Sequence, residues 1–165
     1  MVFGNTKVYD DVKGGWIGMY KKYKLTSETI RINGKTLYRI EALRDFGEIK
    51  KGDKGGFIEK ESNLSHEDLC WVYDDAKVYG KARVYGDAQV CGFAKVYGYA
   101  EVYVDTQVYD DAMVYGFAKV WGNAEVYGDA KVGGNAVLSG NDKVYGNAVV
   151  YDNVSKLYYD VNREG

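Results

Sequence analysis

From Val72 to Val150, an aliphatic residue recurs at every sixth position of the chain. A small residue, most often Ala, follows each of them at the fourth position, and Asp142 is the one clear departure. Gly with Asp or Asn lies between them, as in Gly122-Asn123. Because alternate strand residues face opposite sides, the aliphatic and small residues share one face and the tyrosines share the other. The pattern predicts short strands separated by tight turns at residues that tolerate positive φ.

Strands of this length are too short to be stable alone, but they can pair with equivalent strands when the chain winds into a coil. The narrow interior that the small residues require favours a β-solenoid. The repeat resembles the hexapeptide-repeat superfamily of left-handed parallel β-helices. That resemblance implies three strands per coil of 18 residues and a left-handed winding, against the usual right-handed crossover. More closely, the segment that starts Trp71-Val-Tyr-Asp-Asp-Ala76 is similar to the YdcK-type β-solenoid repeat proteins of phages and prophages, over about residues 19–155.

The expected fold class is all-β, a left-handed three-sided parallel β-helix with a small N-terminal hairpin cap. Alternating apolar residues around Asn33-Gly34 predict the hairpin, which is expected to pack over the open end of the solenoid within a cap of residues 19–57. The solenoid is expected over residues 58–155. A spacing of eight between Leu64 and Val72 predicts a two-residue insertion near His66. Residues 1–18 scan as two further hexads, either a partial repeat or an extension, and residues 156–165 are expected to cover the far end.

Residues 18 apart should lie above one another on the coil, so outward residues form columns. In one column pair, Tyr99 and Phe117 replace the usual polar turn residues, and Met113 replaces a lysine. These substitutions predict an apolar patch that binds a partner, since large apolar patches on soluble proteins mark interfaces. The predicted binding residues are Tyr97, Tyr99, Met113, Tyr115, Phe117, Val149 and Tyr151. The alternative is that the stacked rings only support neighbouring strands.

Composition narrows the function classes. The chain has 165 residues, 22 basic and 24 acidic, for a net charge of −2, which argues against a nucleic-acid binder. A hydrophobic content of 46% argues against disorder. The sequence has neither an apolar run long enough to span a membrane nor the layout of a signal peptide. Two cysteines, Cys70 and Cys91, face different directions in the repeat and are expected as free thiols, which fits the cytoplasm of a bacterial host.

The superfamily resemblance also implies acyl transfer, with a histidine base and coenzyme A. His66 is the single histidine and lies in the lead-in to the repeats, so a turn or capping role is favoured over catalysis. Two cysteines and one histidine in divergent directions do not make a metal site. We therefore predict no catalytic residue, metal or cofactor. Asp142 falls at an inward position, where its carboxylate needs a hydrogen-bond partner.

The predicted function is a non-enzymatic β-solenoid module for protein binding or assembly. The predicted partner is a second copy of the chain, in a dimer or trimer, or a host protein. The resemblance implies an accessory protein of a phage or prophage, and by association an inhibitor of a host defence protein. The alternatives are an acyltransferase using acetyl-coenzyme A, a nucleic-acid mimic and a glycan binder.

Overall fold

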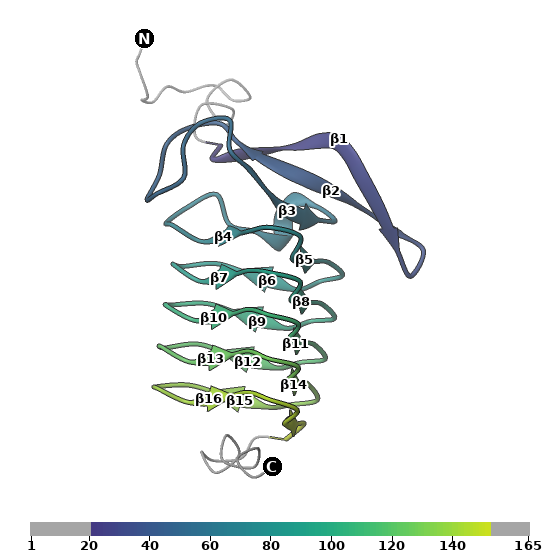
Figure 1. The fold of residues 1–165 in the computed structure, drawn as a ribbon, viewed down its shortest axis with the longest axis vertical. Helices are drawn as coiled ribbons and strands as arrows, with labels where there is room; N and C mark the ends of the chain where they lie inside the picture. The colour runs from purple at the N-terminus through teal and green to yellow at the C-terminus, as the bar shows by residue number, and fades with distance from the viewer. Residues whose placement is uncertain (1–20, 153–165) are drawn as a thin grey trace.

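A stack of coils of nearly constant size forms most of the computed structural model, which describes residues 21–152 (Figure 1). Strands of two residues recur every six residues along the coils, with a turn between each pair. The strands are β4 (Trp71–Val72), β5 (Lys77–Val78), β6 (Arg83–Val84), β7 (Gln89–Val90), β8 (Lys95–Val96), β9 (Glu101–Val102), β10 (Gln107–Val108), β11 (Met113–Val114), β12 (Lys119–Val120), β13 (Glu125–Val126), β14 (Lys131–Val132), β15 (Val137–Leu138), β16 (Lys143–Val144) and β17 (Val149–Val150).

Every third strand pairs in parallel, so that Val78 lies beside Val96 and Val126 beside Val144. Three sheets result. One has the order β5-β8-β11-β14-β17 along the stack, one β4-β7-β10-β13-β16, and one β6-β9-β12-β15. The prediction of an all-β solenoid of parallel coils is confirmed. Three sheets are consistent with the predicted three-sided coil, and the left-handed winding stays a prediction.

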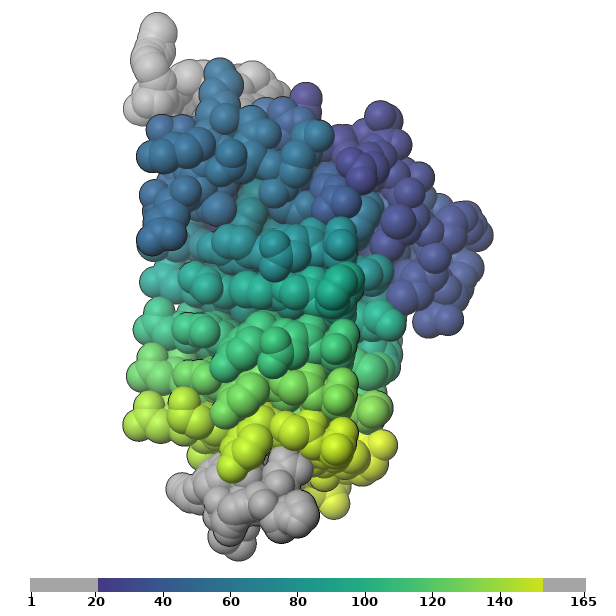
Figure 2. Space-filling model, in the orientation of Figure 1, coloured from purple at the N-terminus to yellow at the C-terminus, as the bar shows by residue number. Residues whose placement is uncertain are grey.

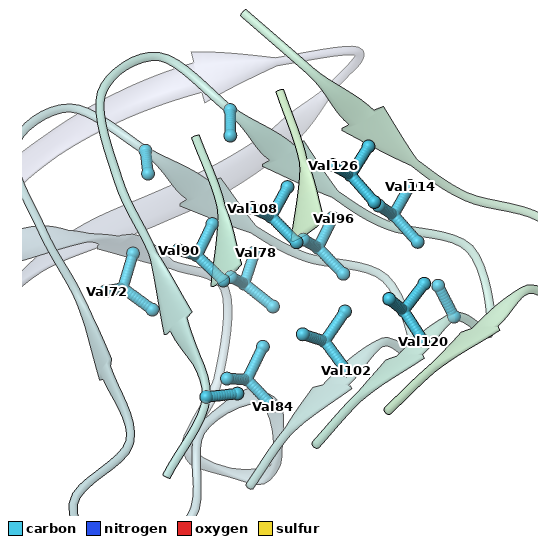
Figure 3. Close-up of a cluster of buried hydrophobic side chains, with 14 of the residues drawn as sticks. Val72, Val78, Val84, Val90, Val96, Val102, Val108, Val114, Val120 and Val126 are labelled. Carbon is cyan, nitrogen blue, oxygen red and sulfur yellow. The ribbon is translucent and has the colours of Figure 1, made fainter. Parts of the chain in front are cut away.

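The interior of the stack is filled by the aliphatic and small residues of the repeat. The ten repeat-position valines labelled in Figure 3, every sixth residue from Val72 to Val126, converge on it from all three sheets, and each of them has an exposed fraction of 1% or less. Burying one valine stabilises the fold by about 1.5–3 kcal/mol. Thr106 occupies an alanine position, and its hydroxyl donates to the Tyr103 carbonyl at 2.8 Å. The polar group is therefore satisfied inside an apolar core.

The predicted insertion is visible in the register between coils. Ile58 pairs with Val78 and Leu64 with Val84, a separation of 20 residues, whereas Trp71 and Gln89 are 18 apart. Two extra residues therefore lie between Leu64 and Trp71, in the segment that contains His66. A single turn of 3-10 helix, η1 (Glu61–Asn63), precedes this segment.

The N-terminal strands β1 (Tyr23–Ile32), β2 (Lys35–Ala42) and β3 (Lys54–Ile58) extend the first sheet in the order β1-β2-β3-β5. The hairpin turns at Asn33 and Gly34, with φ of 50° and 81°, as predicted. Its base caps the core with Tyr23 and Ile40.

The sequence predicts that the hairpin packs over the open end of the solenoid. Its base does so, but its tip projects beside the stack (Figure 2). There Ile30, Ile32 and Leu37 join Tyr79 and Tyr97 in a second apolar cluster. The predictions for residues 1–18 and 156–165 lie outside the described residues. Within the described range, no helix is both long and apolar enough to cross a bilayer.

Candidate functional site

Aromatic rings stack along the outside of all three sheets. Ring centroids are 5.1 Å apart for Tyr79 and Tyr97, and 4.7 Å apart for Tyr85 and Tyr103. The rings in each pair are within 4° of parallel. This regularity follows from the constant spacing of the coils, since each strand lies about 4.8 Å from the next. The predicted columns are therefore present, and stacking by itself supports the strands.

One sheet differs from the other two in what it exposes. We define the aromatic face as the outward residues of β8, β11, β14 and β17 with the turn that follows each strand. Tyr97 and Tyr115 stack with centroids 5.3 Å apart, and Tyr99 and Phe117 stack at 5.0 Å. The Tyr115 and Tyr151 hydroxyls are 3.1 Å apart, so the tyrosine column continues across Gly133 to the last described coil.

Two residues of the aromatic face replace lysines. Met113 pairs in register with Lys95 on one side and Lys131 on the other, and Val149 pairs next to Lys131. Side chains that would carry charge at these positions are apolar instead. All seven residues predicted for the patch lie on this one face, in three of its four successive coils, and the coil of β14 has Lys131 and Gly133 instead.

The side chains of the aromatic face differ in how much of their surface is exposed to solvent. Phe117 and Tyr99 are 59% and 53% exposed, whereas Tyr97 is partly buried against the apolar cluster that contains Leu37 of the hairpin. Val149 and Tyr151 are also about half exposed. The face is thus open between the hairpin and the last described coil.

The sequence reasoning missed Phe93, which is 59% exposed at the turn before β8. Its turn position is held by Asp75 one coil earlier and by Asp111 one coil later. The signal that identified Tyr99 and Phe117, an aromatic residue in a polar turn column, was present for Phe93 as well. Phe93 borders the aromatic face on the edge opposite Tyr99.

Part of the repeat matches a known protein family. Residues 76–92 match the family model described as the YdcK beta solenoid repeat. The stack of parallel coils is consistent with a YdcK-type β-solenoid. The match covers one coil, and the same geometry recurs in the other coils of the stack. No curated protein matches the chain.

His66, in the inserted segment, has both ring nitrogens engaged. Its Nδ1 accepts the Lys22 backbone N–H at 3.0 Å, and its Nε2 lies 2.8 Å from Glu61 Oε1. The ring stacks on Tyr23 with centroids 4.1 Å apart. Burial lowers the pKa of His66, and Glu61 opposes that shift. An accepting Nδ1 means a neutral ring with its proton on Nε2, so His66 serves as a structural link rather than a free general base.

A buried lysine ties the inserted segment to the cap. The Lys22 ammonium donates to the carbonyls of Cys70 at 2.8 Å, Asp68 at 3.2 Å and Glu67 at 3.3 Å. Burial lowers the pKa of Lys22, and burial also raises the pKa of the neighbouring Cys70 thiol. The three carbonyls satisfy a buried cation and fix the loop that follows His66.

Both cysteines are free thiols, as predicted, with Cys70 buried and Cys91 partly exposed.

Asp142 is only half buried, and its Oδ2 accepts the Ser139 backbone N–H at 3.1 Å. The carboxylate therefore closes a turn. This backbone N–H is the hydrogen-bond partner that the inward position of Asp142 requires. Across residues 21–152, no group of three or more His, Cys, Asp and Glu side chains could hold a metal ion.

Proposed function

We propose that this protein is a non-enzymatic binding module that self-associates through the aromatic face. The carrying observation is the exposed Tyr99–Phe117 stack, on the same face as Met113, which stands where the neighbouring coils have lysine. Clusters of exposed aromatic residues on a soluble protein often mark interfaces. Aromatic residues and Met are enriched at such contacts, and Lys is depleted.

The coil stack favours binding because it presents these side chains already ordered. Tyr97, Tyr99, Tyr115 and Phe117 are held by stacking at 5.0–5.3 Å, so little rotamer freedom remains to be lost on association. Preorganised groups lower the entropic cost of binding. A second copy offers a partner surface of the same apolar character, and a net charge of −2 opposes association only weakly.

The proposal extends to the setting of this module. The resemblance to repeats of phages and prophages supports an accessory protein of such a genome, acting in the cytoplasm of a bacterial host on a host protein. Two free thiols, Cys70 and Cys91, are compatible with that reducing compartment.

The test is the mass in solution, measured by light scattering after size-exclusion chromatography. The wild-type chain is expected at a multiple of 18.5 kDa, and Phe117→Asp at 18.5 kDa. The matched control is Asn123→Asp, which adds the same charge at an exposed turn of another column and should leave the oligomer intact. All three proteins should melt within a few degrees of one another. A monomeric wild-type protein, or an oligomer that survives Phe117→Asp, would contradict the proposal.

A further inference from the structure

The outward tyrosine column that begins at Tyr73 has no aromatic ring at its second position, which is Cys91. The column on the sheet of β4, β7, β10, β13 and β16 contains Tyr73, Cys91, Tyr109, Tyr127 and Tyr145. Ring centroids are 4.9 Å apart for Tyr109 and Tyr127, and 5.3 Å apart for Tyr127 and Tyr145. Cys91 therefore occupies the position where one ring of a continuous stack is missing.

The missing ring coincides with a cavity of about 630 Å³. Its apolar wall comes from Phe46, Ile49 and Leu69, which belong to the cap and to the inserted segment. Tyr73 lines one side, and Cys91 contributes its thiol. Burial raises the pKa of Cys91 to about 11, so this thiol is neutral near pH 7 and behaves as a small apolar group.

The aromatic rings of the neighbouring coils do not fill the gap in the column at Cys91. In the aromatic face the equivalent gap at Gly133 is closed, because a Cβ at Gly133 would lie 2.5 Å from the Tyr115 ring. In the column with Cys91, the Tyr109 hydroxyl instead bonds Glu125 of the next coil at 3.1 Å. The Tyr109 ring is thereby held toward the next coil, away from Cys91. Within the described range, no ring contact joins Tyr73 to Tyr109.

We propose that this cavity binds a small molecule with a planar aromatic ring system that bears an N–H or O–H donor, of the indole or phenol class. Two coil steps separate the backbones of Tyr73 and Tyr109 by about 9.6 Å, so one ring position of the column is vacant next to Tyr73, which lines the cavity with Cys91. Glu48 and Gln89 are the polar residues of the cavity, and a carboxylate and an amide oxygen accept from an N–H or O–H. The cavity thus combines apolar side chains with polar groups that can fix the orientation of a ligand, as small-molecule sites do.

Isothermal titration calorimetry with indole and with 4-methylphenol tests the proposal on the full chain. Wild-type protein should bind at least one of these probes, and cyclohexanol, which is of similar size but not planar, at least tenfold more weakly. Cys91→Tyr supplies the missing ring and should weaken binding at least tenfold while raising the melting temperature. Cys91→Ser keeps the space and should retain binding. Ser139→Tyr, which adds a ring to a different column, should also leave binding unchanged.

Alkylation of Cys91 by iodoacetamide gives a second readout that needs no variant. Saturating indole should slow alkylation of Cys91 at least fivefold, because the bound ring covers the thiol. The proposal is wrong if neither probe binds, if cyclohexanol binds equally well, if Cys91→Tyr binds like wild type, or if indole leaves the alkylation rate unchanged.

Discussion

Val104 is held in a backbone conformation that suits its side chain poorly. Its φ is 63° at a turn where the coils above and below have Gly86 and Gly122, with φ of 67° and 76°. The left-handed region costs an L-residue about 1–2 kcal/mol, and Asn and Asp tolerate it best. Two other turns with positive φ have Asp at the equivalent position. Asp74 and Asp110 have φ of 55° and 61°, and each carboxylate accepts the N–H of a glycine in the next coil at 3.0 Å.

Val104→Asn should therefore stabilise the protein. The amide oxygen is placed to accept the Gly122 N–H, for which no acceptor is found within residues 21–152. Relief of backbone strain contributes about 1 kcal/mol, and the new hydrogen bond contributes about 1 kcal/mol. Val104 is 41% exposed, so the lost apolar contact costs about 1 kcal/mol. The net gain of about 1 kcal/mol corresponds to a rise in melting temperature of about 2–4 °C.

Differential scanning calorimetry can measure this change, with Asp110→Val as the reverse exchange. Asp110→Val leaves the Gly128 N–H without its acceptor and puts a β-branched residue at positive φ. It should lower stability by about 2 kcal/mol. Opposite shifts of the two variants would support the argument. If Val104→Asn melts no higher than wild type, strain at this turn is not what limits stability.

Three further predictions concern the core, a histidine and the thiols. Val108→Ala removes two buried methyl groups and should lower the free energy of unfolding by about 2–3 kcal/mol, measured by urea titration. The folded-state pKa of His66 lies below its ordinary value of 6.5, so stability present above pH 6.5 should be lost as the pH falls below it. The melting temperature of His66→Gln should fall less between pH 7 and pH 5. In native protein Cys91 should be alkylated faster at pH 9 than at pH 7, and buried Cys70 only after unfolding.

The repeat made much of the fold and of the aromatic face predictable. A period of six residues that matches one strand and one turn specifies which residues point inward, and a pairing interval of 18 specifies which residues stack. Tyr97 on Tyr115 and Tyr99 on Phe117 follow from that interval without any further information. Phe93 obeys the same rule, because the 18-residue interval places it in a turn column with Asp75 and Asp111.

The contacts between the cap and the stack were decided only by the tertiary structure. Nothing in the period of the repeat links Ile30 to the apolar cluster around Tyr79, Lys22 to the carbonyl of Cys70, or Phe46 to the cavity at Cys91. These contacts join segments outside the periodic region to positions within it, and they depend on how the hairpin and the two-residue insertion bend. A pattern along the chain determines neighbours at fixed spacing, whereas non-periodic segments find their neighbours through the shape of the folded surface.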